Sequence, residues 1–465
     1  MTKKIIIALL GLFVIYDTFR SFDQHLHMPL DGDMALIVLP ADVFKTAMKE
    51  PFGIKATIHG QRYHATNRAF AHWTMCLYFK TVPFAFQLIS SPLDSVYLSA
   101  ALAKILFQLL IAYMLARYAM PGAFRFSDLI ISMAILTPLF QTGGFNQYMG
   151  IIDQSITYSF FYALPVGLLL VFFFPFYRYF VWAEPFKFSL LKHIIWMLLI
   201  VLLSFNGPLT PAITSTAIAF IFGLWIFYRL SGTKISPMDA TVRNYLIIFG
   251  LLASYSLYLG TFNAENFSTP MSVYHRYVNL LTGLREIFIG NVAVPLLLIL
   301  LILNFIILKK QNAKTTIQQI AGPIIIFCLI YIILLPLGGY RNYRPNVIRN
   351  DTAIPILICW FFLFVFSTHC VIKEQFKLKG VYTSLLCALL LFFHLSDGHI
   401  SAHNKSEKKA ILEIAKSEKH CVVINDYCTI MSYRPITDSL ESSMNTELLQ
   451  YWGVLDKQRL YYQKY

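Results

Sequence analysis

The sequence predicts an all-α polytopic membrane protein with about eleven transmembrane helices, an N-in/C-out orientation and a small α/β extracytoplasmic tail. Its 465 residues are 57% hydrophobic and 13% charged, with a mean hydropathy of +0.60. Soluble domains carry about 25% charged residues. The apolar residues form long runs along the whole chain, and Lys and Arg gather on alternate connections between the runs.

The apolar runs define the predicted helices, because a bilayer is crossed by about 20 apolar residues. They lie at residues 5–19, 95–116, 127–141, 155–176, 190–205, 209–228, 244–262, 288–308, 317–337, 353–372 and 380–395. The first run follows a basic start and is similar to a signal peptide. No small-residue cleavage motif follows it, so we expect an uncleaved first helix.

Basic residues predict the orientation. With the N-terminus inside, every inside segment is basic: Lys3 and Lys4; Arg117 and Arg125; Arg178, Lys187 and Lys192; Arg229, Lys234 and Arg243; Lys309, Lys310 and Lys314; Lys373, Lys377 and Lys379. The short outside loops at 142–154 and 205–208 contain neither Lys nor Arg. The net charge of +14 is therefore explained by cytoplasmic loops, and we expect no nucleic-acid partner.

Two domains follow from this topology: a multi-spanning domain, 1–395, and a C-terminal extracytoplasmic domain, 396–465. The first outer loop, 20–94, belongs to the spanning domain. Segment 263–287 and the loop Gly338 to Thr352 face the same side. A chain that places its unusual polar residues on one side is expected to work there.

The C-terminal domain shows short-range patterns of secondary structure. "KKAILEIAKSEK" has apolar residues at helical spacing, and "CVVINDYCTIMSY" predicts two strands joined by a turn at Asn425 and Asp426. Cys421 and Cys428 flank that turn. A disulfide and reduced packing of the two thiols are both open alternatives.

The first outer loop begins with an acidic motif, "LDGD", which contains Asp31 and Asp33. A solvated turn, or a cap for a helix in "MALIVL", would explain such a motif without chemistry. The loop that follows is apolar and aromatic yet rich in His and Arg, so we expect it to pack against the rest of the molecule. We therefore interpret Asp31 and Asp33 as catalytic candidates and Asp42 as a helix-end residue.

A second constellation is "YRNYRPNVIRND", where basic residues lie on the outer side against the charge bias. Tyrosines alternate with arginines, a composition that suits contacts with a phosphate or a sugar. The predicted phosphate-binding residues are Arg341, Arg344, Arg349, Tyr340 and Tyr343. Binding to outer-leaflet lipid phosphates, or pairing with Asp351, are the alternatives.

Further candidates for lining the same outer cavity are His64, Arg68, Asp153, His275 and Arg276. His275 and Arg276 belong to a predicted interfacial helix at 271–288, for which anchoring at the membrane surface is the simpler role. The chain contains no P-loop, no GxGxxG after a strand, no HExxH and no GxSxG. ATP-driven transport and metalloprotease chemistry therefore have no support in the sequence.

This layout resembles the GT-C superfamily of integral membrane glycosyltransferases. Its members begin with one short helix and a long first outer loop that has acidic residues near its start, and many end in a soluble domain on that side. The resemblance implies a polyprenyl-phosphate-linked sugar as donor and a glycan, lipid or protein as acceptor. It implies an Asp of "LDGD", Asp31 or Asp33, as base, and the arginines of "YRNYRPNVIR" as ligands of the donor phosphate.

Some members of that family require a divalent metal, and Asp31, Asp33 and Asp153 could bind one, although no spacing here demands it. We expect an enzyme of a bacterial inner membrane whose active side faces the periplasm. A polymerase or ligase of surface polysaccharide, a transporter or flippase without chemistry, and a structural or assembly subunit are the alternatives.

Overall fold

The computed structural model describes residues 2–120, 122, 124–142, 150–207, 209–232, 237–267, 271–289, 292–310, 314–338, 346–398 and 403–464. Within this part of the chain, nine helices are long and apolar enough to cross a membrane, and two shorter apolar helices accompany them. These helices indicate an integral membrane protein.

Each predicted apolar run forms a helix. The long ones are α1 (Thr2–Leu26), α6 (Pro92–Tyr118), the continuous helix α8, η3 and α9 (Ile156–Tyr158, Ser159–Ala163, Leu164–Trp182), α11 (Leu209–Leu230), α12 (Ala240–Gly260), α14 (Ala293–Lys310), α15 (Lys314–Leu334) with η5 (Leu335–Leu337), α16 (Asn350–Lys373) and α17 (Lys379–Ser396). The shorter ones are α7 (Phe126–Leu136) with η1 (Thr137–Leu139), and α10 (Leu190–Ser204).

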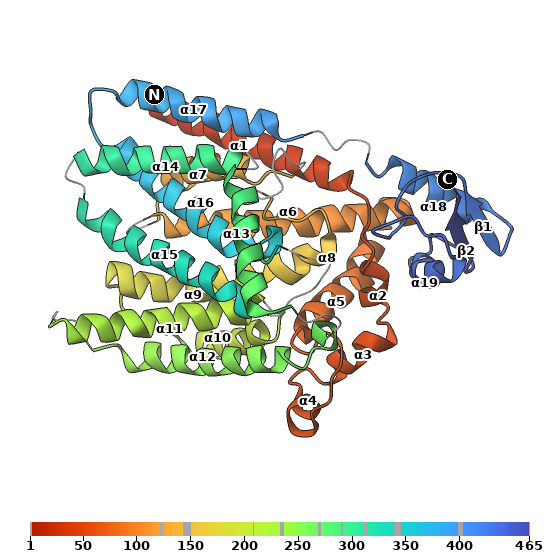
Figure 1. Ribbon diagram of the computed structural model, residues 1–465. Coiled ribbons are helices and arrows are strands. Elements are labelled where there is room, and N and C mark those ends of the chain that lie inside the picture. Colours follow the sequence, from red (N-terminus) through yellow and green to blue (C-terminus); the bar gives the residue numbers. More distant parts are fainter. Residues whose placement is uncertain are drawn as a thin grey trace.

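The long helices run roughly alongside one another as a bundle, with α16 and α6 in its interior (Figure 1). Of the apolar window of α16, 83% is buried, against 11% for α1 at the periphery. Helix α16 packs on α14, and α6 packs on α1, α5 and α9. Peripheral helices keep large apolar side chains exposed, among them Leu9 and Ile15 of α1, as a lipid environment favours.

Helix α1 is longer than its apolar run and continues to Leu26. Its polar extension is held by the end of α17 and by the residues that follow that helix. The guanidinium of Arg20 donates to the carbonyls of His394 and Asp397, at 2.5 Å each, and Gln24 donates to the carbonyl of Gly398 at 2.7 Å. These bonds let the helix continue where its apolar residues end.

The first loop, 20–94, is mostly helical. It contains α2 (Met34–Val38), α3 (Asp42–Lys49), α4 (Ile54–His59) and α5 (Ala69–Phe86). Asp42 begins α3, as the sequence predicts. Helix α5 was not expected from the sequence, and it packs along α6 and against α2. Helix α13 (Val273–Ile289) forms over the predicted segment 271–288 and crosses the bundle helices at a steep angle (Figure 1).

The C-terminal unit, residues 403–464, contains α18 (Lys405–Lys416), β1 (Cys421–Ile424), η6 (Ser439–Ser442), α19 (Ser443–Tyr451) and β2 (Leu460–Gln463). The predicted hairpin after Asn425 and Asp426 is wrong. Strand β1 pairs in parallel with β2, Cys421 opposite Leu460, and the residues after the turn leave the sheet. Cys421 and Cys428 are both free thiols.

The C-terminal unit is bound to one end of the bundle, which we call the tail side (Figure 1). The indole Nε1 of Trp452 donates to the carbonyl of Phe79 at 3.0 Å, and Gln87 donates to the carbonyl of Trp452 at 2.8 Å. At the end of α1, the amide N–H of Asn404 donates to the carbonyl of His27 at 3.1 Å. The unit is therefore fixed against both α5 and α1.

Candidate functional site

Asp31 is buried on the tail side at the start of the helix that begins with α8. Its carboxylate accepts four hydrogen bonds: from the N–H and the Oγ1 of Thr157 (2.8 Å each), from the Oγ of Ser155 (2.9 Å) and from the N–H of Asp33 (3.0 Å). A carboxylate at a helix N-terminus is stabilised by the unpaired N–H groups and the helix dipole. Asp31 thereby joins the first loop to α8.

Asp33 lies two residues further and is half-buried. It precedes α2 but its side chain makes no capping bond to that helix. Its Oδ2 instead accepts a hydrogen bond from the phenol of Tyr433, in the C-terminal unit, at 3.0 Å. Asp33 therefore faces the C-terminal unit, whereas Asp31 is enclosed by protein donors.

Lys104 brings a positive charge to this acidic cluster. It belongs to the apolar helix α6, and it is 1% exposed. Its Nζ donates to the carbonyl of Gln154 and lies 3.2 Å from the Sδ of Met28. The carboxylates of Asp31 and Asp153 are close enough to act on its charge. Intramembrane cations are costly and are retained mostly for function or pairing.

Asp153 is the third carboxylate of the cluster. Burial raises its pKa to about 6. The N–H of Ser155, which donates to Oδ1 at 2.8 Å, and the charge of Lys104 oppose this rise in pKa, whereas the charges of Asp351 and Asp31 add to it. Near neutral pH, Asp153 can therefore exchange a proton, as general acid–base catalysis requires.

A large cavity of about 890 Å³ has Asp351 in its wall, and Asp351 acts electrostatically on Asp153 of this cluster. Connecting segments and the first turns of helices supply its polar lining, whereas α11, α12 and α15 with η5 supply most of its apolar lining. The lining residues are Asn67, Arg68, Tyr162, Leu209, Ala212, Thr216, Leu257, Tyr258, Gly260, Thr261, Asn263, Arg276, Tyr331, Leu334, Leu335, Pro336, Leu337, Gly338, Asn346, Val347, Arg349, Asp351 and Thr352. Such a lining suits an amphiphile with a polar head.

The first loop reaches this cavity because it is hydrogen-bonded to the ends of α10 and α12. Thr66 Oγ1 donates to the carbonyl of Leu259 at 3.0 Å, and Asn67 donates to the carbonyl of Ser256 at 3.2 Å. The N–H of Gly207 donates to the carbonyl of Asn67 at 3.0 Å. These bonds place Asn67 and the adjacent Arg68 in the cavity wall.

Three arginines line the cavity, and their donors are used differently. Arg276 donates to the carbonyls of Met271 (3.1 Å), Pro336 (3.3 Å) and Gly338 (2.8 Å), so it mainly joins α13 to the segment after α15. Arg349 forms an ion pair with Asp351. Arg68 lies 4.0 Å from Glu265, and its buried Nε has no hydrogen-bond partner in the described part of the chain.

Four predicted phosphate ligands, Tyr340, Arg341, Tyr343 and Arg344, lie outside the described residues. The described residues that flank them, Gly338 and Asn346, both line the cavity. Of the predicted cavity residues, Arg68 and Arg276 line it, and Asp153 lies in the acidic cluster.

The two predicted histidines lie near residues of this region. His64 lies 3.6 Å from Glu265, which also faces Arg68. His275 lies on α13, next to Arg276, and its Nδ1 is 2.7 Å from the Oγ of Ser272.

One ring contact at α8 and one electrostatic interaction link the region of the acidic cluster with the cavity. The rings of Tyr158 and Tyr162 meet at 5.7 Å, and Tyr162 lines the cavity. Asp351, also in the cavity wall, acts electrostatically on Asp153. The first-loop acids and the segment that contains Arg349 therefore belong to one region of the tail side.

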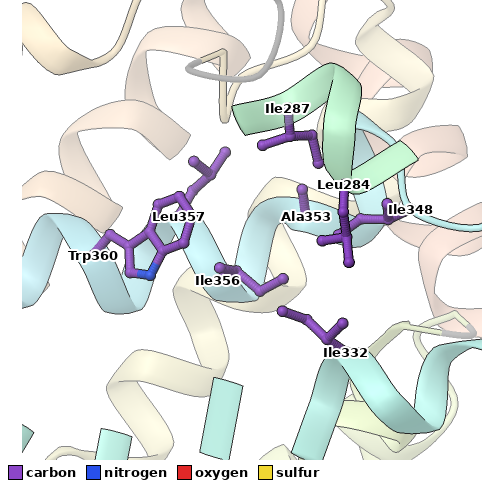
Figure 2. Close-up of a pocket in the computed structure, with 8 residues that line it drawn as sticks. All are labelled: Leu284, Ile287, Ile332, Ile348, Ala353, Ile356, Leu357 and Trp360. Carbon is purple, nitrogen blue, oxygen red and sulfur yellow. The ribbon is translucent and has the colours of Figure 1, made fainter. Parts of the chain in front are cut away.

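A second pocket lies between α13, α15 and α16, and Figure 2 shows its lining. Its volume is about 10 Å³ and all eight lining side chains are apolar, among them Leu284 and Ile287 of α13 and Trp360 of α16. A cavity of that size holds at most about one water, which would lack polar partners here. We interpret it as a packing gap where α13 is held to α16.

No group of three His, Cys, Asp or Glu side chains suited to a metal occurs among the described residues. The hydrogen bonds that the carboxylate of Asp31 accepts in the structure all come from protein groups.

Sequence reasoning missed Lys104, Tyr433 and Glu407. Lys104 could have been found from the sequence, because it is a single charge inside the apolar run 95–116. No sequence pattern marks Tyr433 or Glu407, because only the packing of the C-terminal unit brings them to the first loop.

Comparison with protein-family models, with characterised proteins and with solved structures gives no match.

Proposed function

We propose that the protein is a membrane glycosyltransferase of the GT-C type, which moves a sugar from a polyprenyl phosphate to an acceptor on the tail side. The observation that carries the proposal is the cavity of about 890 Å³, lined by Arg68, Arg276 and Arg349 and by apolar helix faces. Asp351 in its wall acts electrostatically on Asp153 of the acidic cluster. A lipid-linked phosphate needs cations beside its phosphate and an apolar surface along its lipid chain, and the lining offers both.

We propose that the tail side is extracytoplasmic, in an N-in/C-out topology of eleven spans that counts α7 and α10. The support is the distribution of charge. The end of α14 carries Lys309 and Lys310, the end of α16 carries Lys373, and the connection after α16 carries Lys377. The connection after α16 lies at the end of the bundle away from the C-terminal unit (Figure 1). Basic loops favour the cytoplasmic side. In a bacterium, the tail side would face the periplasm.

The cavity would hold the donor, with its phosphate at the arginines and its prenyl chain along α11 and α15. Arg68 has an unused buried donor, and Arg349 can share its guanidinium between Asp351 and a phosphate. Cations at the phosphate stabilise the negative charge that grows there as the sugar departs.

Asp33 would be the base. The acceptor O–H bond breaks and its proton passes to the carboxylate of Asp33, while the acceptor oxygen bonds to the anomeric carbon. The bond from that carbon to the phosphate oxygen breaks, and the polyprenyl phosphate leaves with the electron pair. We assign this role to Asp33 because Asp31 already accepts four protein hydrogen bonds.

The test uses the full chain in lipid nanodiscs, a panel of undecaprenyl-phosphate hexoses as donors and alkyl glycosides as acceptors. Release of undecaprenyl phosphate and formation of glycosylated product are measured together. We expect turnover by the wild type, loss of turnover in Asp33→Asn, and retained binding of undecaprenyl phosphate in that variant.

Arg349→Ala should instead weaken binding of undecaprenyl phosphate about tenfold or more, because a charge-assisted hydrogen bond contributes about 1.5–3 kcal/mol. Arg434→Ala, at an arginine exposed on the C-terminal unit, is the control and should bind normally. Undiminished turnover in Asp33→Asn, or wild-type protein that binds no undecaprenyl phosphate, would refute the proposal.

A further inference from the structure

The C-terminal unit contributes a side chain directly to the acidic cluster. The phenol of Tyr433 donates to Asp33 at 3.0 Å, across about four hundred residues of sequence. Burial raises the pKa of that phenol, and the charges of Asp31 and Asp33 raise it further, so Tyr433 stays a donor. The residue as a whole remains 58% exposed, and therefore borders the solvent from which an acceptor would arrive.

The position of Tyr433 favours glycine at position 32. A Cβ on Gly32 would lie 2.8 Å from the ring carbon Cδ2 of Tyr433, a distance that real Cβ atoms essentially never show. It would also lie 3.0 Å from the backbone nitrogen of Tyr433, which is tighter than most real Cβ contacts. The backbone of "LDGD" and the chain at Tyr433 are thus in direct contact, between the two aspartates.

The turn before Tyr433 is strained. Met431 is buried and has a φ of +47°, a conformation that side-chain-bearing residues rarely adopt. Asn445 holds this turn by donating to the carbonyls of Ile430 (3.2 Å) and Met431 (3.0 Å). Strained residues persist when their surroundings over-determine them, and they concentrate at functional sites. Here the strained turn directs Tyr433 to Gly32 and Asp33.

One carboxylate, Glu407 of α18, holds both partners of this contact. Its Oε1 accepts from the N–H of Met431 at 2.9 Å. Its Oε2 accepts from the N–H of Leu30 at 2.9 Å and from the phenol of Tyr97 at 2.7 Å. Glu407 is 1% exposed. A single buried group therefore fixes the residue before Asp31 and the residue two before Tyr433.

We propose that Tyr433 is a positioning residue for Asp33, and that the C-terminal unit, bound through Glu407, completes the acceptor side of the site. This inference rests on the proposed glycosyl transfer for its catalytic part. Tyr433 keeps its proton throughout. Its hydrogen bond orients the carboxylate of Asp33 and favours the ionised form that accepts the acceptor's proton. The C-terminal unit is then part of the catalytic machinery rather than an appendage.

The first experiment compares the pH profiles of kcat/KM for the wild type, Tyr433→Phe and the control Tyr427→Phe, which makes the same chemical change at another exposed tyrosine of the unit. Loss of a donor to a carboxylate raises its pKa. We expect the acid limb of Tyr433→Phe to move up by about one pH unit, with kcat about tenfold lower. A profile and a kcat equal to those of the wild type would overturn the inference.

The second experiment needs no turnover. Hydrogen–deuterium exchange is measured by mass spectrometry on the full chain in nanodiscs, for Glu407→Gln, for Gly32→Ala, and for controls at Glu413, exposed on the same helix, and at Gly11, where a Cβ meets nothing within 4 Å. We expect faster exchange at the Leu30–Asp33 and Met431–Tyr433 amides in both test variants, and no change in Glu413→Gln or Gly11→Ala.

The two experiments separate the two proposals. If the wild type turns over no donor but Glu407→Gln and Gly32→Ala show the faster exchange, glycosyl transfer fails and the coupling of the C-terminal unit to the acidic loop is supported. If exchange at Leu30–Asp33 is unchanged in both variants, the coupling is refuted even when the wild type is active.

Discussion

Glu407 accepts a hydrogen bond from the backbone N–H of Leu30 at 2.9 Å, so a residue near the end of the chain holds the residue that precedes Asp31. The other oxygen of the same carboxylate holds Met431, near Tyr433. Because both bonds are buried, loss of the acceptor leaves donors without partners, which costs about 1–3 kcal/mol each. The acidic cluster is therefore assembled from four parts of the chain that lie far apart in sequence: residues 30–33, Lys104, residues 153–157 and residues 407–433.

Asp31→Asn should act mainly on stability. The new amide group would face N–H and O–H donors that now end on a carboxylate, so we expect about 1–3 kcal/mol less stability and a lower midpoint of thermal unfolding. Asp42→Asn, the same change at an exposed helix start, should leave the midpoint unchanged. A midpoint for Asp31→Asn equal to that of the wild type would show that the four hydrogen bonds do not hold the loop.

Lys104→Met should lower the unfolding midpoint, because it removes a buried cation on which the charges of Asp31 and Asp153 act. Adding Asp153→Asn should restore part of that loss, with a coupling of about 0.5–3 kcal/mol in a double-mutant cycle. Lys409→Met, at an exposed lysine of α18, is the control. Additive effects of Lys104→Met and Asp153→Asn would contradict an electrostatic link between them.

Ala212→Trp should block the cavity, because Ala212 lines it on α11. We expect binding of undecaprenyl phosphate in nanodiscs to fall at least about tenfold, since the added side chain fills space that the prenyl chain would use. Ala219→Trp places the same bulk on an exposed position of the same helix and should bind normally. Equal binding by the two variants would place the lipid elsewhere.

The stability of the chain should depend on pH through Glu407. Burial, helped by the charge of Asp31, raises the pKa of Glu407 to about 7, against the hydrogen bonds from Met431, Tyr97 and Leu30. The folded state then binds the proton more tightly than the unfolded state, whose pKa is near 4.5. The stabilising contribution is therefore full below about pH 4.5 and is lost as pH rises through about 7.

The measurement is the unfolding midpoint of the wild type minus that of Glu407→Gln, from pH 4.5 to 8. We expect the difference to fall as pH rises. Taking the difference removes the contribution of Asp153, whose pKa is also raised, to about 6. A difference that stays constant over this range would contradict the assignment to Glu407.

Several features could be predicted from particular residues. The apolar runs predict the helices because a spanning helix satisfies its own backbone hydrogen bonds and needs only apolar side chains around it. Asp42 as the start of a helix, and a helix over 271–288, also follow from local pattern. Helix α5 was missed because His72, Lys80 and Pro83 interrupt its apolar pattern, although its contact with α6 stabilises it.

The sequence by itself determined that this chain has long apolar helices, and it drew attention to Asp31, Asp33 and the arginines around Arg349. Only the tertiary structure decided that Asp31 is enclosed while Asp33 faces Tyr433, and that Lys104 and Glu407 complete the cluster. Helix formation depends on residues within a few positions of each other, which a sequence displays. Partners 76 to 400 residues apart meet only through packing, which no local pattern encodes.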